Sequence, residues 1–438
     1  MDHAIVLAAG TGIEGENLSL HARRYIGEIL QLKRLIIIAQ RSGIKKFTII
    51  VEGDPSDLKK ELEGDGQIEG EINWVSAGLP LKLDLIIYIV IQSNVVINPE
   101  ALVPLVSYSS GDEYEVGVLL DEEKDAWVKV EGEKVDEVFP FGGKAVGIFV
   151  ASGAVLEKVV SNSLSLREWL QELTGRESVK PIPLRDGYWM RMTSDEGSVK
   201  KAEDILFANI TKSTSGWMSR NINSRFSIPV SRLLIRTPLT PNIISAMIGF
   251  IGILSGVFYY LGRPVLGAFS LELSTIFDRC DGEVARIKLM ESRRGQWIDT
   301  IFDHLSFLSF VIGVPLGFYK LGGGLVAITL GGVNLAIFLF FVAWSFYFLL
   351  KYADSGSVAI YSKRIDELIP REKRSFFHRI LLKLRPGMKR EVFSFVFLLA
   401  AIFGGYIWVL SLSTFGLVLT LIHQIDDVIK LRKKTTAN

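Results

Sequence analysis

The sequence predicts a soluble α/β domain followed by an all-α domain of six transmembrane helices. Up to about residue 205, short apolar runs typical of buried strands alternate with stretches of helical periodicity. The second half instead contains long apolar segments, several of which are long enough to cross a bilayer. The mean hydropathy of +0.31 is positive, which is unusual for a soluble protein of 438 residues. These observations indicate a soluble domain fused to a membrane domain.

The first predicted domain covers residues 1–205 and has the alternation of a Rossmann-like α/β fold. Apolar runs such as Ala4–Leu7 and Phe47–Val51 are expected to form strands. Stretches such as Ile26–Gln40 are expected to form helices between them. The first strand leads directly into a glycine-rich turn, A-A-G-T-G, where a nucleotide-binding site is often found.

The second predicted domain covers residues 240–438 and consists of six helical spans. Thr240 and Pro241 suit the N-cap and the first turn of the first span. One short apolar run also fits a buried helix of a soluble protein, but six in succession favour a membrane domain. Charged residues interrupt the second span and the last, so these two are not uniformly apolar. The expected spans are about 240–261, 264–289, 295–319, 322–350, 390–411 and 413–431.

Between the two domains, residues 206–239 are predicted to form an amphipathic juxtamembrane segment. Its arginines are interleaved with large apolar residues, a pattern typical of a helix lying on an anionic membrane surface. A solvated linker helix is the alternative, which the large apolar residues disfavour. The residues concerned are Trp217, Arg220, Arg225, Phe226, Arg232, Leu233, Leu234 and Arg236.

Charge and cysteine content indicate the compartment and the partners. The segment Lys351–Arg390, between the fourth and fifth spans, holds eleven Lys or Arg, whereas the opposite loops hold essentially Arg263 and Lys320. By the positive-inside rule, the soluble domain, the long loop and both termini are expected on the cytoplasmic side, with the plasma membrane as the expected location. Cys280 is the only cysteine, which excludes a disulfide framework. The net charge of +1 gives no indication of nucleic-acid binding.

Four aspartates form the most informative cluster of the chain. Asp278 and Asp281 are three residues apart, and Asp299 and Asp303 are four apart, so each pair shares one face of a helix. Four carboxylates in an apolar region cannot all stay ionised without cations. Because no His or Cys accompanies them, hard cations such as Mg²⁺, Mn²⁺ or Ca²⁺ are expected. Together with Arg286 the four aspartates sum to about −3, so two divalent ions would leave a small positive charge suited to a pyrophosphate.

Small residues accompany these carboxylates. Gly282 follows one of them, Ala285 lies one helical step further, and Gly295 stands near the start of the second acidic helix. A glycine inside a helix costs stability, so its presence indicates that a ligand needs the space. A solvated charged loop would explain two or three acids, but not this spacing.

The complete pattern D-x2-D-G-x2-A-R-x8-G-x3-D-x3-D resembles the signature of the CDP-alcohol phosphotransferases. These are integral membrane enzymes that move a substituted phosphate from a CDP-linked donor to an alcohol with release of CMP. All eight signature positions match: Asp278, Asp281, Gly282, Ala285, Arg286, Gly295, Asp299 and Asp303.

The resemblance implies a role for each of these residues. The four aspartates are expected to hold two Mg²⁺ or Mn²⁺ ions, with Asp303, together with Asp299, as the catalytic residues and Asp303 as the base. The nucleotide is expected near Asp278, Asp281, Gly282, Ala285, Arg286 and Gly295. Asn242, in T-P-N, is expected either to line the nucleotide pocket or simply to start a helix. Arg390, in R-E-V-F, resembles an arginine that family members turn toward the site, and we expect it to bind the acceptor.

The first domain resembles the sugar-phosphate nucleotidyltransferases in its opening A-I-V-L-A-A-G-T-G. The family's phosphate-binding residues are replaced here by Ile13-Glu14 and Arg24-Tyr25-Ile26-Gly27, and its metal-binding aspartates by Gln92-Ser93-Asn94 and Arg191. Without these carboxylates a metal-dependent attack on CTP lacks electrostatic support. We therefore expect a cytidylyltransferase-like domain that is catalytically inactive.

Fusion of these two domains resembles microbial proteins that make CDP-inositol and join it to inositol phosphate. The expected partners are a CDP-alcohol donor, an alcohol acceptor and the lipid bilayer, with a homodimer left open. The acceptor is left open between inositol phosphate and a small polar acceptor of phospholipid synthesis. A divalent-cation transporter is the alternative function, since intramembrane carboxylates also line ion pathways. It does not account for Arg286 or for the small residues.

Overall fold

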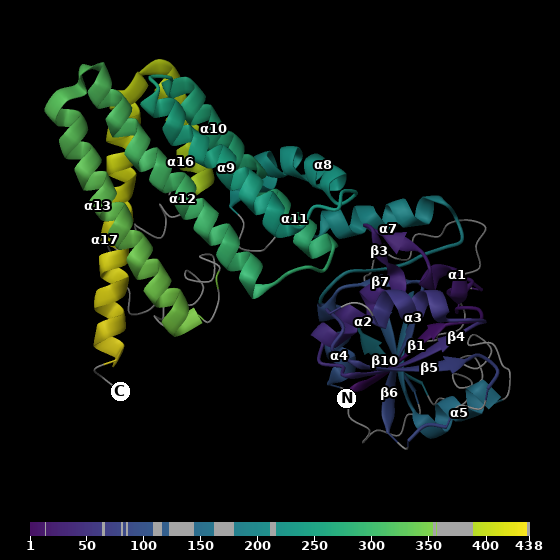
Figure 1. The fold of residues 1–438 in the computed structure, drawn as a ribbon. Coiled ribbons are helices and arrows are strands. Elements are labelled where there is room, and N and C mark those ends of the chain that lie inside the picture. Colours follow the sequence, from purple (N-terminus) through teal and green to yellow (C-terminus); the bar gives the residue numbers. More distant parts are fainter. Residues whose placement is uncertain are drawn as a thin grey trace. The chain divides into compact units, whose positions relative to one another are not determined.

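The chain divides into two compact units, Met1–Asn209 and Ile210–Asn438, close to the predicted boundary after residue 205. The structure is a computed structural model (Figure 1). It describes residues 1–13, 15–63, 66–79, 82–84, 86–107, 116–121, 144–161, 179–210, 216–353, 356 and 389–435.

The first unit is built on a mostly parallel sheet of seven strands among the described residues, in the order β10-β8-β9-β6-β1-β4-β5. The central strand β1 (His3–Ala8) pairs in parallel with β4 (Lys46–Val51) and β6 (Ile87–Gln92). Strand β9 (Lys144–Ser152) is antiparallel to both of its neighbours. These strands are nearly continuous apolar runs because helices cover both faces of the sheet. The α/β class predicted for this domain is confirmed.

The parallel pairing places the ends of β1 and β6 at one edge of the sheet. The glycine-rich turn follows β1, and Gln92-Ser93-Asn94 closes β6, so both predicted features meet at this edge. The remaining elements of this unit are α1 (Leu18–Ala22), β2 (Tyr25–Ile26), β3 (Ile29–Leu30), α2 (Gln31–Arg41), α3 (Ser56–Glu63), β5 (Glu71–Ser76), β7 (Val95–Ile97), η1 (Pro99–Leu102), α4 (Val103–Val106), β8 (Val116–Asp121), α5 (Gly153–Ser161), β10 (Val179–Pro183), β11 (Trp189–Arg191) and α7 (Gly197–Ala208).

The helix predicted over Ile26–Gln40 begins later than expected. Residues 25–30 form the antiparallel hairpin of β2 and β3, and the helix α2 starts only at Gln31. The turn residues Gly27 and Glu28 have φ values of 57° and 63°, a left-handed conformation that a helix cannot contain. The apolar periodicity of the segment fits a continuous helix and therefore gives no indication of this turn.

The second unit is helical, and each of the six predicted spans contains helix among the described residues. In the part of the chain that the structure describes, three helical stretches are long and apolar enough to cross a membrane: Pro241–Tyr260, Arg293–Tyr352 and Gly405–Asp426. The middle stretch combines two helices across a kink at Gly322. A count of six crossings stays a prediction. The helices are α9 (Pro241–Tyr260), α10 (Pro264–Phe277), α11 (Arg279–Ile287), α12 (Arg293–Phe318), η4 (Tyr319–Gly323), α13 (Gly324–Phe348), η5 (Leu349–Ala353), α16 (Arg390–Phe403) and α17 (Gly405–Thr435).

Two predicted spans differ from the observed helices. The range 264–289 is divided at Asp278 into α10 and the short helix α11. The predicted span 390–411 is broken where α16 ends at Phe403, because Gly405 has a φ of 61° and opens α17. The break at Asp278 therefore places one carboxylate of the motif at the junction between α10 and α11.

Small residues let α9 and α12 approach each other closely. A Cβ added at Gly252 would lie 2.4 Å from Ser306 Oγ, and one at Gly256 would lie 2.0 Å from the carbonyl oxygen of Ser309. Backbones can come this close only where side chains are absent, as is common between membrane helices. This packing holds α12, which carries two of the motif aspartates, against α9.

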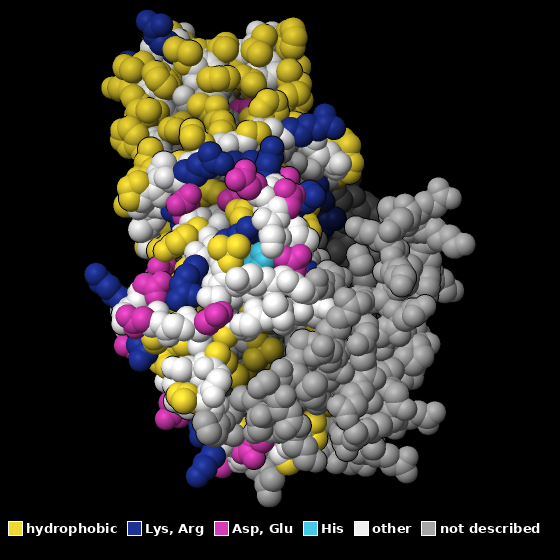
Figure 2. Space-filling model, turned by 90° about the vertical axis from the view of Figure 1, so that its right-hand side faces the viewer, with side chains coloured by type: hydrophobic (Ala, Val, Ile, Leu, Met, Phe, Trp, Pro, Cys, Tyr) yellow, Lys and Arg dark blue, Asp and Glu magenta, His cyan; other side chains and the backbone are white. Residues whose placement is uncertain are grey.

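The surface of the helical unit is largely apolar. Leu325 is 74 % exposed and Phe403 is 85 % exposed, and Figure 2 shows hydrophobic side chains gathered over this part of the molecule. Large exposed apolar patches are unfavourable in water, whereas a lipid environment accommodates them.

The predicted juxtamembrane segment contains η3 (Ser219–Asn223) and α8 (Ser224–Leu234). Phe226 and Leu233 are 56 % and 67 % exposed, whereas Ser227 and Ser231 are fully buried. The helix is therefore amphipathic with a polar side turned inward and apolar residues turned outward, the reverse of a solvated helix.

Candidate functional site

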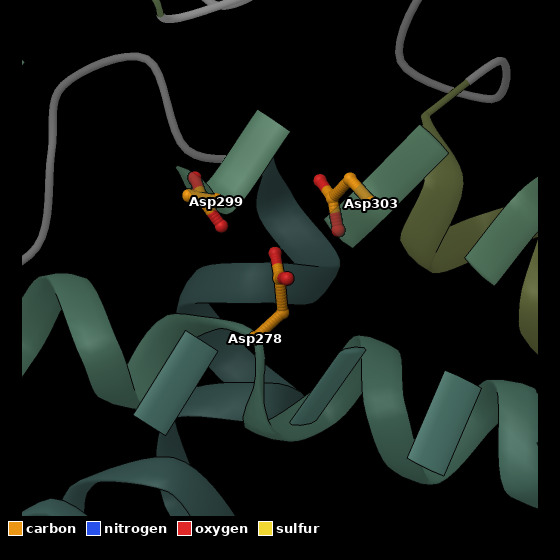
Figure 3. A group of neighbouring side chains, drawn as sticks. All are labelled: Asp278, Asp299 and Asp303. Atoms are coloured by element: carbon orange, nitrogen blue, oxygen red, sulfur yellow. The ribbon is translucent and has the colours of Figure 1, made fainter. Parts of the chain in front are cut away.

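Three of the four motif aspartates meet at one point. Asp278, Asp299 and Asp303 each offer a carboxylate oxygen, and these oxygens lie within 4.8 Å of one another (Figure 3). Asp278 stands at the junction of α10 and α11, while the other two come from neighbouring turns of α12. Three carboxylates at this separation can bind a cation of the hard, oxygen-preferring class.

The start of α12 orients the second pair of aspartates. The helix begins at Arg293, two residues before the predicted start, and the side chain of Ser292 accepts a hydrogen bond of 3.0 Å from the amide of Gly295. This N-cap fixes the first turn. Since Asp299 and Asp303 are four residues apart, the helix places both on the face that meets Asp278.

Arg390 supplies the positive charge at this site. Its guanidinium is bonded to the carboxylate of Asp303 and lies 3.6 Å from Asp278. The residue opens α16, so this helix begins at the carboxylate cluster. Sequence reasoning expected this arginine to face the site, and the structure places it there.

Asp281 lies outside the group of three among the described residues. Its carboxylate accepts hydrogen bonds from the hydroxyl of Ser245 and from the amide of Gly282. Asp281 is buried, with 8 % of its surface exposed. The structure therefore brings together three of the four predicted metal ligands and turns the fourth toward α9.

The small residues predicted to line the nucleotide pocket lie beside polar side chains. A Cβ added at Gly282 would lie 3.3 Å from a guanidinium nitrogen of Arg286, and one at Gly295 would lie 3.1 Å from Asn242 Oδ1. Ala285 is buried on the same helix as Gly282. The predicted residues Asn242 and Gly295, 53 positions apart, are thus neighbours in the fold.

Sequence reasoning missed Ser245, which binds Asp281. The signal was available, because Asn242 and Ser245 are polar, lie three residues apart at the start of an apolar helix and so share a face. Both side chains meet the acidic motif. The pattern N-x-x-S, interpreted together with the motif, predicts a polar edge on α9.

A shallow, open apolar depression lies between α9 and α12. Ile298 and Phe302, which immediately precede Asp299 and Asp303, form one wall. None of the described motif aspartates lines this surface. Its lining residues are Asn242, Ile243, Ala246, Met247, Phe250, Ile298 and Phe302.

Comparison with known families decides the class of this site. Residues 238–366, which include every residue of the acidic motif, match the family described as CDP-alcohol phosphatidyltransferase. The chain carries a CDP-alcohol phosphatidyltransferase domain. The predicted reaction class, a transferase acting on CDP-alcohols, is confirmed at this level, and members of this family act on a CDP-alcohol donor and an alcohol acceptor.

Relatives extend the similarity beyond the CDP-alcohol phosphatidyltransferase domain. A protein of Aquifex aeolicus named bifunctional IPC transferase and DIPP synthase is 24% identical over 338 residues, 72% of this chain and 77% of that protein. A protein of the same name from Thermococcus kodakarensis is 27% identical over 333 residues, 71% of this chain and 74% of that protein. An archaetidylinositol phosphate synthase of Pyrococcus horikoshii is 31% identical over 104 residues, 23% of this chain and 55% of that protein. None of these relatives is a transporter, so the alternative function has no support.

Among solved structures, the inositol-1-phosphate CTP transferase from T. maritima aligns with 47% of this chain and 96% of its own. The sequence identity is 17% and the TM-score is 0.34.

In the first unit, the glycine-rich turn is hydrogen-bonded to the end of β6. The amide of Ile13 donates a hydrogen bond of 3.2 Å to Gln92 Oε1, and the Ile13 side chain is 1 % exposed within the apolar core. Ser93 Oγ donates to the carbonyl oxygen of Leu18 at 2.6 Å. Glu14 lies outside the described residues. The amide of Ile13 is therefore occupied by a side chain of the protein. A phosphate-binding loop instead leaves its amides available to the ligand.

The two positions predicted to have lost metal ligands lie close together. A Cβ added at Gly147 would lie 3.5 Å from Arg191 Cδ and 3.6 Å from Gln92 Cδ. The side chains of Gln92 and Arg191 thus approach the same point of the backbone of β9. Neither group binds Mg²⁺ as a carboxylate does.

Proposed function

We propose that the protein is a membrane enzyme that transfers the alcohol-bearing phosphate of a CDP-alcohol to the hydroxyl of an acceptor alcohol and releases CMP. The observation that carries this proposal is the meeting of Asp278, Asp299 and Asp303 within 4.8 Å, inside the segment that matches the family. A cluster of this kind neutralises a diphosphate only with cations, and phosphoryl transfer depends on such neutralisation.

Two Mg²⁺ or Mn²⁺ ions are the proposed cofactors. The residues present fit such ions, because three carboxylates converge and two of them, Asp278 and Asp303, already pair with the cationic Arg390. Asp278, Asp299 and Asp303 would hold the ions, and Asp281 would join them from its place beside Ser245. When bound, the ions supply charge neutralisation of the donor's diphosphate and of the departing CMP.

The chain's own residues carry the remaining steps. Asp303 is the proposed base, which takes the proton of the acceptor hydroxyl. The acceptor oxygen then forms a bond to the phosphorus that bears the alcohol, and the bond from that phosphorus to the CMP oxygen breaks. Arg286, beside Gly282, is proposed to bind the nucleotide, with Asn242, Ala285 and Gly295 lining the pocket.

The preferred donor is CDP-inositol, and the preferred acceptor is inositol phosphate. This choice is supported by the relatives named bifunctional IPC transferase and DIPP synthase, whose similarity extends over more than 70% of this chain. A CDP-linked lipid donor with a small polar acceptor is the second candidate. It is favoured by the open apolar depression between α9 and α12, where the exposed side chains of Met247 and Phe250 offer acyl chains a surface.

Incubation of the full chain in nanodiscs with labelled donors tests this proposal. CMP release with CDP-inositol and inositol phosphate would support the first substrate pair, and release with CDP-diacylglycerol and inositol phosphate would support the second. No CMP release with either donor, in the presence of Mg²⁺, would contradict the proposed function.

The proposed setting is the plasma membrane, with the first unit and both termini in the cytoplasm and α8 on the lipid surface. The basic segment Lys351–Arg390 and the exposed Phe226 and Leu233 support this orientation. The CDP-activated donor would then reach the carboxylates from the cytoplasm. A homodimer is the proposed assembly, because much of the helical surface is apolar.

The first unit is proposed to be a cytidylyltransferase-like domain without activity. We expect no pyrophosphate release when the full chain is given CTP, Mg²⁺ and inositol 1-phosphate, because Gln92 and Arg191 cannot replace two carboxylates. The T. maritima inositol-1-phosphate CTP transferase serves as the positive control. Pyrophosphate release by this chain above the level without alcohol phosphate would refute the assignment.

Arg390 is the proposed contact to an anionic acceptor. In Arg390→Gln, kcat/KM for inositol phosphate is expected to fall by about tenfold or more, equivalent to about 1.4 kcal/mol, while binding of the CDP donor changes little. The physical reason is the loss of a forked cation at the carboxylate cluster. Lys389→Gln, with the same change of charge one residue earlier, is the control. Unchanged acceptor kinetics in Arg390→Gln would assign this arginine to membrane anchoring.

A further inference from the structure

Glu283 is a buried carboxylate inside the acidic motif that the proposed mechanism does not use. It is 0 % exposed and lies on α11, directly after Gly282. A buried charge is costly unless it is paired and hydrogen-bonded, so its partners indicate what it does. They come from its own helix and from α8.

Both oxygens of Glu283 are bound by serines of α8. Ser227 Oγ donates to one oxygen at 3.0 Å, and Ser231 Oγ donates to the other at 2.7 Å. Both serines are fully buried and, being four residues apart, share one face of α8. The carboxylate therefore joins the juxtamembrane helix to the motif helix by two charge-assisted hydrogen bonds.

Arg279 completes this connection. Its guanidinium lies 3.0 Å from Glu283 one turn along α11, and its Nε lies 3.2 Å from Ser227 Oγ. It also donates to Ser219 Oγ, in the segment before α8. The pair thus binds the juxtamembrane segment at three serines, none of which sequence reasoning selected.

The geometry of α11 gives these bonds a consequence for the site. Positions 278, 281, 282 and 285 share one helical face, and positions 279 and 283 share the neighbouring one. The helix has only nine residues, follows the break at Asp278 and ends just before Leu289, whose φ of 54° is left-handed. A helix this short depends on tertiary contacts for its position.

We propose that Glu283 is a positioning residue that, held by Ser227 and Ser231, fixes the rotation of α11 so that Gly282, Ala285 and Arg286 face the nucleotide. This inference rests on the proposed function, since it assigns the nucleotide to α11. The juxtamembrane helix is then part of the donor site as well as a contact to the membrane surface.

The double variant Ser227→Ala/Ser231→Ala tests the proposal in the full chain. It removes both serine bonds to Glu283, together with the bond from Arg279 Nε to Ser227 Oγ, and leaves the Arg279–Glu283 pair intact. KM for the CDP donor is expected to rise about fivefold or more, while kcat at saturating donor and KM for the acceptor change less than twofold. Ser231→Thr, which keeps the hydroxyl, is expected to behave like the wild type.

Ser224→Ala is the matched control. Ser224 is also buried on α8, but its hydroxyl bonds the carbonyl oxygen of Arg220 within its own segment and does not reach α11. Unchanged donor KM in the double variant, or an equal rise in Ser224→Ala, would overturn the positioning role. Absence of CMP release in the wild type would instead be a failure of the proposed function, so the two failures are distinguishable.

Discussion

Asp303→Asn is expected to lower the rate of transfer by about 10³-fold or more while leaving the protein folded. Asparagine keeps the shape of the side chain but loses both the negative charge that holds a cation and the ability to take a proton, and general base catalysis alone is worth about 10² to 10⁴. The loss of charge also releases Arg390 from its carboxylate partner. CMP release by the purified variant measures the effect.

Asp299→Asn is expected to give a loss of similar size, because Asp299 offers an oxygen to the same point. The control is Asp204→Asn, which neutralises an exposed carboxylate on α7. Thermal unfolding of each variant should stay within a few degrees of the wild type, since neither side chain belongs to the apolar core. Transfer at a near wild-type rate by either motif variant would contradict the assigned roles.

Removal of divalent cations is expected to abolish transfer. Transfer should cease in excess EDTA and return with Mg²⁺ or Mn²⁺, because the converging carboxylates repel one another and a dianionic diphosphate without cations. Mg²⁺ should also raise the midpoint of thermal unfolding, since a cation that binds only the folded state stabilises it. In Asp303→Asn this rise should be smaller. Full activity in EDTA would contradict a metal-dependent mechanism.

The acidic motif could be predicted from the sequence because its spacing encodes helical faces directly. Positions three or four residues apart must share a face, so the convergence of Asp299 and Asp303 followed from the pattern alone. The meeting of these residues with Asp278 required α12 and α10 to pack against the same helix, α9, which the spacing of the motif does not encode. The orientation of Asp281 depended instead on one hydroxyl, that of Ser245, which no spacing rule singles out.

Other parts could not be predicted because they depend on single backbone conformations or on partners far along the chain. The hairpin of β2 and β3 depends on positive φ angles at Gly27 and Glu28, in a segment whose apolar pattern fits a helix. The bonds between Ser231 and Glu283 join residues 52 positions apart. The spacing of serines on an amphipathic helix does not indicate which distant residue they bind.

Transfer of an isotopic label tests directly whether the protein moves the alcohol-bearing phosphate from a CDP donor to an acceptor alcohol. CDP-inositol and CDP-diacylglycerol, each labelled with ³²P in the phosphate that bears the alcohol, would be given to the full chain in nanodiscs with Mg²⁺ and inositol phosphate. With at least one donor, the label is expected to pass into the acceptor product in an amount equal to the unlabelled CMP released. Label that stays with the nucleotide, or that appears only as free alcohol phosphate without an acceptor product, would contradict the proposed transfer.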